Sequence, residues 1–200
     1  MTRYWFDTEF MEDGTVIELL SIGITCDDGR ELYMESSEAD TSHANEWVRK
    51  NVLPHLGLAR QFTKAEIAEA VRRFVTGKPE FWAYYGDYDW VVLCQLFGTM
   101  MDLPETWPMF AMDVKQLCVT LGNPKLPEQT SVEHNALNDA RWTKEAWEFL
   151  HAARRGVPSS SSHVHEFGEW RTTMVLSNGQ WRMLGHCRCG EYEWKDNEPT

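Results

Sequence analysis

Residues 4–10 read YWFDTEF, a run of aromatic residues and one threonine with two acids among them. Such a composition is typical of a strand inside a sheet. Side chains two positions apart on a strand share a face, so Asp7 and Glu9 lie side by side, about 7 Å apart. Two ionised carboxylates in that position repel each other and lose hydration. Either the strand lies at an exposed edge, or a divalent cation compensates the repulsion.

The segments around this run predict an α/β architecture. Strands are expected over residues 3–10, 15–26 and 31–36, and they form an antiparallel meander. A short aromatic strand is expected over residues 80–85. Helical periodicity and capping signals predict helices over residues 44–53, 63–75, 89–97, 113–121 and 136–153. The signals include the Thr63–Glu66 capping box, Pro54 as the end of the first helix and Asn135 as the N-cap of the last. A meander followed by alternating helices and strands predicts a mixed sheet covered by helices.

The composition changes after the last predicted helix. Residues 154–162 read RRGVPSSSS, which is typical of a flexible linker, so we expect one domain over residues 1–153 and a small extension over residues 163–200. Within the extension, SNGQ at residues 177–180 lies between two apolar segments and predicts a β-hairpin.

The same extension offers donors for a structural zinc ion. Cys187 and Cys189 lie near His163, His165 and His186. However, the C-x-C spacing is shorter than the usual C-x₂₋₄-C of zinc sites. The favoured alternative is a small hairpin that packs its tryptophans against the main domain or a partner.

Composition and charge restrict the classes of function. The 200 residues are 42% hydrophobic and 25% charged, which is typical of a globular protein, and neither a membrane span nor a signal peptide is evident. Five cysteines, an odd number, indicate a reduced cytoplasm. The net charge of −12 argues against a protein that binds nucleic acid through a basic face. It leaves open an enzyme that holds phosphates through bound cations.

Further candidate ligands follow along the chain. Asp89 comes directly after the predicted strand at residues 80–85, where α/β proteins form sites, although it or Asp87 could simply cap a helix. Asp139 lies one turn into the last predicted helix and can face the sheet, and His134 precedes that helix on a loop. Carboxylate oxygens favour Mg²⁺ or Mn²⁺ over zinc.

The combined pattern resembles the DEDDh group of 3′–5′ exonucleases, which have a ribonuclease H-like fold. The matching motifs are D-x-E at residues 7–9, Tyr-Asp at 88–89 and H-x₄-D at 134–139. The stretches DTEFMEDGTVIELLSIGITCDDGRE, YDWVVLCQLFG and HNALNDAR are most similar to the polyadenylate-specific exoribonuclease AS family, over residues 3–153. All five motif positions are filled, which argues against an inactive copy.

The resemblance implies a two-metal mechanism with Mg²⁺ or Mn²⁺. Asp7 would bridge both ions, Glu9 and Asp139 would complete the first site, and Asp89 would support the second. His134 would act as the general base toward the attacking water. The products would be nucleoside 5′-monophosphates released from the 3′ end of a single strand.

The resemblance also implies substrate contacts just after the D-x-E motif. Phe10 and Met11 are the residues concerned, together with Thr8 inside the motif, and an aromatic ring such as Phe10 can stack on an unpaired base. Phe10 could equally be a core residue. The expected substrate is single-stranded RNA, the resemblance implies a preference for adenosine-rich 3′ ends, and relatives are often homodimers.

Two other functions remain open at this point. The same chemistry on DNA is one, because a contact to the ribose 2′-hydroxyl is not readable from sequence. A non-catalytic nucleic-acid-binding module is the other, and the filled motif positions and the acidic charge both argue against it.

Overall fold

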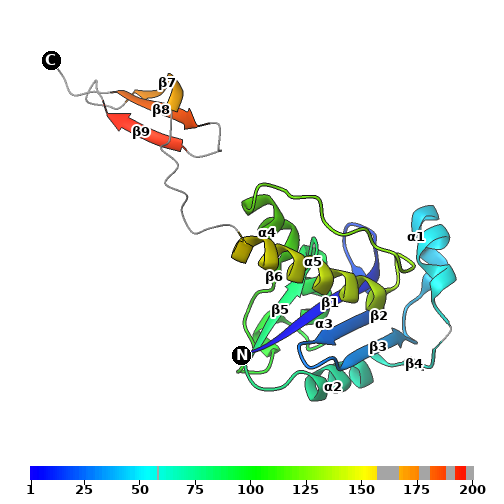
Figure 1. Cartoon of the computed structure of the whole chain (residues 1–200). Helices are drawn as coiled ribbons and strands as arrows, with labels where there is room; N and C mark the ends of the chain where they lie inside the picture. Colours follow the sequence, from blue (N-terminus) through cyan, green and yellow to red (C-terminus); the bar gives the residue numbers. More distant parts are fainter. Residues whose placement is uncertain (58, 157–166, 176–180, 188–191, 197–200) are drawn as a thin grey trace. The chain divides into compact units, whose positions relative to one another are not determined.

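The computed structural model describes residues 1–57, 59–156, 167–175, 181–187 and 192–196 (Figure 1). It divides the chain into two compact units, Met1–Gly156 and Val157–Thr200. Most of the predicted linker lies outside the described residues, so the predicted domain organisation stays a prediction. No helix in the described part of the chain has both the length and the apolar character needed to cross a bilayer.

The first unit contains a six-stranded mixed sheet in the order β4-β3-β2-β1-β5-β6. The three long strands β1 (Thr2–Glu12), β2 (Ile17–Cys26) and β3 (Glu31–Ser36) form the predicted antiparallel meander. The short strand β5 (Pro79–Ala83) then pairs parallel to β1. The α/β mixed sheet expected from the sequence is therefore confirmed.

Two edge strands were not predicted. They are β4 (Gln61–Phe62), which is parallel to β3, and β6 (Met112–Asp113), which is parallel to β5. Each has only two residues, too few for an alternating pattern to stand out.

The helices follow the predicted order with shifted ends. They are α1 (Glu46–Asn51), α2 (Lys64–Phe74), α3 (Asp87–Gln95), α4 (Val114–Thr120) and α5 (Ala136–Gly156), with short 3₁₀ turns η1 (Thr41–His43), η2 (Leu53–His55) and η3 (Met100–Asp102). The Thr63–Glu66 capping box is present at the start of α2. Pro54 was expected to end a helix but lies in the 3₁₀ turn η2. Helix α5 continues through Gly156 instead of ending at residue 153, so the first residues of the predicted linker are helical.

The sheet separates two apolar cores. On one face Tyr4, Phe6 and Phe81 pack with side chains from α2 and α3. On the other face Trp5 and Trp82 pack with side chains of α4 and α5. Figure 1 shows α5 running across β1 and β2. Since residues alternate along β1, Asp7 shares the face of Trp5, beneath α5.

The second unit contains an antiparallel sheet of β7 (Phe167–Val175), β8 (Trp181–Cys187) and β9 (Tyr192–Asp196). Strands β7 and β8 pair as the predicted hairpin requires. Three of the candidate zinc donors, His163, His165 and Cys189, lie outside the described residues, so the zinc hypothesis stays a prediction.

Candidate active site

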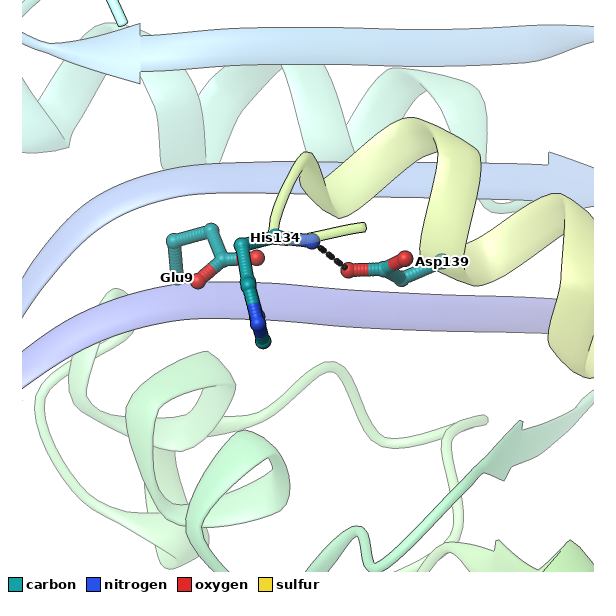
Figure 2. Close-up of side chains that lie close together, drawn as sticks. All are labelled: Glu9, His134 and Asp139. Carbon is teal, nitrogen blue, oxygen red and sulfur yellow. Dashed lines mark hydrogen bonds between the residues drawn. The ribbon is translucent and has the colours of Figure 1, made fainter. Parts of the chain in front are cut away.

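The candidate site lies where β1 passes beneath the start of α5. Glu9 is only 7% exposed in the middle of the sheet. One carboxylate oxygen of Glu9, one ring nitrogen of His134 and one carboxylate oxygen of Asp139 all lie within 4.8 Å of one another. Figure 2 shows these three side chains brought together from β1, the loop before α5 and α5 itself.

A close approach of backbones brings Asp139 to the sheet. Gly23 on β2 pairs with Asp7 on β1, so the two positions share a face. A Cβ atom at Gly23 would lie 2.3 Å from the backbone of Ala136 and Leu137 in the first turn of α5. Only a glycine at position 23 allows the first turn of α5 to pack this closely on β2.

Hydrogen bonds orient Asp139 and the preceding loop. The backbone N–H of His134 donates to Asp139 Oδ2 at 3.0 Å, and the side-chain amide of Gln129 donates to Oδ1. His134 has a φ of 60°, a left-handed conformation that is uncommon for residues with a side chain. As predicted, Asn135 caps α5, accepting from the N–H of Asn138 at 3.2 Å. The turn thus places the imidazole and the Asp139 carboxylate at the same point.

Asp89 reaches the site from the first turn of α3. It is 6% exposed, and its Oδ1 accepts hydrogen bonds from the Thr8 N–H at 2.8 Å and the Thr8 hydroxyl at 2.6 Å. The alternative role as a helix cap is wrong for Asp87 and Asp89, because Gly86 is the N-cap residue of α3. Asp87 is exposed, which favours Asp89 as the site residue.

Burial and mutual repulsion raise the pKa of Asp7 and Glu9. Burial raises the pKa of Asp7 well above its usual value, and the charges of Asp89, Glu9 and Asp139 raise it further. Burial followed by the charges of Asp139 and Asp89 raises the pKa of Glu9 to about 8. Four carboxylates therefore act on one another in a single site.

The other two carboxylates carry compensating hydrogen bonds. Burial raises the pKa of Asp89 to about 6, although the hydrogen bonds from Thr8 oppose this. Burial also raises the pKa of Asp139 against the hydrogen bonds from Gln129 and His134. These bonds stabilise charge on Asp89 and Asp139, whereas Asp7 accepts no hydrogen bond from the described residues.

The donor set suits a hard divalent cation. It consists of four carboxylates at a buried position where their charges repel one another, with one imidazole beside them. A divalent cation would remove the repulsion, and oxygen donors are those that Mg²⁺ and Mn²⁺ prefer. These residues fit the metal site that the sequence predicts.

The three residues predicted to bind substrate have different surroundings. Thr8 is buried and donates its hydroxyl to Asp89. Phe10 is half-buried against the main core and stacks on the exposed Tyr88, with ring centroids 5.5 Å apart and planes at 11°. Met11 is half-buried near α1. Their roles in substrate binding stay predictions.

Several neighbours of the site escaped the sequence analysis. They are Trp47, Gln129 and Gly23, each in contact with a predicted site residue or beside one. Trp47 is the one residue among them whose type could have drawn attention in the sequence, but the chain has ten tryptophans. Trp90 and Trp107, by contrast, pack in the core.

Comparison with known proteins identifies the family. Residues 2–151 match the model of the 3′-5′ exoribonuclease Rv2179c-like domain. The chain belongs to this family. The 3′-5′ exoribonuclease Rv2179c of Mycobacterium tuberculosis (strain ATCC 25618 / H37Rv) is 44% identical over 146 residues, which are 70% of this chain and 87% of the relative. Membership of the family confirms the prediction of a 3′–5′ exonuclease.

Solved structures support the fold. The zinc-bound complex of E. coli ExoI with single-stranded DNA matches with a TM-score of 0.57 at 15% identity, over 78% of this chain and 41% of that one. A product-bound exonuclease I matches with a TM-score of 0.54 at 16% identity, over 77% and 44%. The family member thus spans less than half the length of these exonucleases, and at such identity the likeness extends to the ribonuclease H-like fold alone.

Proposed function

We propose that the protein is a metal-dependent 3′–5′ exoribonuclease of the DEDDh type that releases nucleoside 5′-monophosphates from single-stranded RNA. The observation that carries this proposal is the convergence of four carboxylates from β1, α3 and α5 beside the His134 imidazole. Their mutual repulsion without a cation supports metal binding as the purpose of the cluster.

Asp7, Glu9, Asp89 and Asp139 would hold two Mg²⁺ or Mn²⁺ ions. When bound, such ions neutralise the carboxylates, polarise the scissile phosphate and make water more acidic. Thr8, Gln129 and the His134 N–H keep Asp89 and Asp139 oriented for this role. Metal binding would require little reorganisation of the carboxylates, because their positions are already set.

His134 would accept a proton from the attacking water. The water oxygen bonds to phosphorus while the bond from phosphorus to the 3′-oxygen of the preceding nucleotide breaks. That oxygen leaves as the new 3′ end and takes up a proton, and the terminal residue departs as a 5′-monophosphate. Imidazole is the side chain that most often acts as a general base in such a proton transfer.

The substrate assignment rests on family membership and local chemistry. The half-buried Phe10, stacked on exposed Tyr88, supports contact with the terminal base, and Met11 and Thr8 would complete that contact. We include a preference for adenosine-rich 3′ ends, assembly as a homodimer and a cytoplasmic location in the proposal. Free, buried Cys26, Cys94 and Cys118 are consistent with a reducing compartment.

Release of mononucleotides from 3′-end-labelled oligo(A) RNA, beside oligo(U), oligo(C) and matched oligo(dA), tests the proposal. We expect 5′-monophosphates from RNA with Mg²⁺ or Mn²⁺, faster release from oligo(A), and no release with EDTA or in Asp139→Asn. Faster digestion of oligo(dA) would instead make the protein an exodeoxyribonuclease, and release in EDTA would contradict the metal mechanism.

A further inference from the structure

The imidazole of His134 has little to hold it. Residues 123–135 contain no helix or strand, and the one hydrogen bond of His134 among the described residues comes from its backbone N–H. None of the described residues forms a hydrogen bond with its imidazole ring. A general base must nevertheless be held within reach of the proton that it removes.

The ring of Trp47 contacts this imidazole. Their centroids lie 4.8 Å apart and their planes make an angle of 76°, an edge-to-face arrangement. Trp47 lies on α1, about 90 residues before His134 in the chain and on none of the elements that carry the carboxylates. Its side chain is 55% exposed, so packing in the core does not account for its position.

Helix α1 is capped at its start and packs on the sheet through its inner face, which fixes the position of Trp47. At its start the Asn45 side chain caps the helix, accepting from the Val48 N–H at 2.8 Å. Along its inner face the buried Val48 and Val52 pack on Leu20 of β2. These contacts fix the backbone of α1, and with it that of Trp47, relative to β2.

After α1, the buried carboxylate of Glu35 holds the following segment on the sheet. Glu35 of β3 is 1% exposed, and its Oε2 accepts from the Gly57 N–H at 2.7 Å. The Tyr33 hydroxyl donates to its other oxygen at 3.0 Å. The segment that carries Trp47 is therefore held on the same sheet as Glu9.

We infer that Trp47 is a positioning residue for His134, whose ring it holds against the carboxylate cluster. This inference rests on the proposed function, in which His134 accepts the proton from water. Without the indole the imidazole can adopt other rotamers, so fewer enzyme molecules hold the base in place at any moment. The expected consequence is a lower kcat with unchanged binding of metal and RNA.

The competing role for an exposed tryptophan beside a nuclease site is stacking on an RNA base. Loss of a stacked base contact weakens substrate binding and raises KM. Loss of a positioning contact lowers kcat and has no effect once the base itself is absent. Steady-state kinetics therefore separate the two roles.

The kinetic test uses Trp47→Ala, Trp47→Phe, His134→Ala, the double variant Trp47→Ala/His134→Ala and the control Lys50→Ala, at an exposed position of the same helix. We expect Trp47→Ala to lower kcat about 10- to 100-fold, with KM and calorimetric Mn²⁺ affinity unchanged. Trp47→Phe should restore most of the activity, and Lys50→Ala should match the wild type. The double variant should be as slow as His134→Ala alone.

A spectroscopic measurement tests the contact without reference to activity. The ring protons of His134, assigned by their absence in His134→Ala, should experience the ring current of Trp47 in the full-length protein. Trp47→Ala should move these NMR signals and leave those of the other six histidines in place. A thermal melt of each variant checks that it is folded.

Three results would overturn the inference. They are a raised KM with unchanged kcat in Trp47→Ala, an equal further loss of rate in the His134→Ala background, and His134 signals that do not move. Failure of the proposed function is distinguishable, because the wild type would then release no mononucleotide while the NMR shift would still report the contact.

Discussion

Asp7 is the residue on which the site depends most. It lies on the face beneath α5, and three other carboxylates raise its pKa. It accepts no hydrogen bond from the described residues, whereas Asp89 and Asp139 each accept two. The metal-free fold therefore disfavours the ionised form of Asp7, and a bound cation would stabilise that form.

Asp7→Asn should abolish turnover and also stabilise the metal-free protein. Removing the ionisable group relieves the repulsion on its neighbours. At pH 8 without metal the free energy of unfolding should therefore increase by about 1 kcal/mol or more, and the melting temperature should rise. Calorimetry and nuclease assays check both effects. Asp87→Asn, an exposed acid two residues before Asp89, is the matched control and should change neither.

Among the contacts between secondary-structure elements, the contact between α5 and β2 sets the position of the site residues. The first turn of α5 rests on the backbone of β2 because Gly23 has no side chain. This turn carries Asp139, and His134 and Asn135 directly precede it, so their distance from β1 depends on one close approach.

Gly23→Ala should therefore move Asp139 and His134 away from the carboxylates of β1. Its Cβ would lie 2.3 Å from the backbone of α5, so the helix must move. We expect a loss of about 1–3 kcal/mol in stability and loss of most activity and Mn²⁺ affinity. Denaturant melts, nuclease assays and calorimetry measure these quantities.

Gly29→Ala provides the control for that experiment. Gly29 has a φ of 81° and open space around it, so alanine there strains the backbone without displacing α5. It should cost stability and leave turnover intact. Equal loss of activity in both variants would mean that destabilisation alone, and no displacement of α5, explains the effect.

For the whole molecule, the raised pKa values link stability to pH and to metal. Burial raises the pKa of Glu9 from 4.5 to about 8 and the pKa of Asp89 from 3.8 to about 6. Folding favours their protonated forms, so the stability they contribute is fully present below about pH 4 and is lost as pH rises toward 8.

The metal-free protein should therefore melt at a higher temperature at pH 6 than at pH 8. Added Mg²⁺ or Mn²⁺ should raise the melting temperature more at pH 8, because the ions bind the ionised carboxylates. Scanning calorimetry over this range with EDTA or metal measures both trends. In Asp7→Asn the metal-dependent part should be reduced, and a melting temperature independent of pH would contradict the link.

Truncation after Gly156 tests the role of the second unit. The family match covers residues 2–151, and the site residues all lie in the first unit. We expect the truncated chain to hydrolyse oligo(A) at the rate of the full chain. A large fall in kcat, with an unchanged melting temperature, would assign the second unit a part in catalysis.

Features that arise from neighbouring residues could be predicted from the amino-acid sequence. Alternation along YWFDTEF placed Asp7 and Glu9 on one face, and the side chains of Thr63 and Asn135 marked two helix starts. Such features depend on backbone geometry over a few residues, which the local sequence controls.

The contacts between residues far apart in the chain could not be predicted in this way and follow from the packing of the folded protein. The choice of Asp89 over Asp87 depended on where α3 begins, and the contacts of Thr8 with Asp89, Gly23 with α5 and Trp47 with His134 join segments far apart in the chain. No local pattern encodes such contacts, because they result from the packing of whole elements against the sheet.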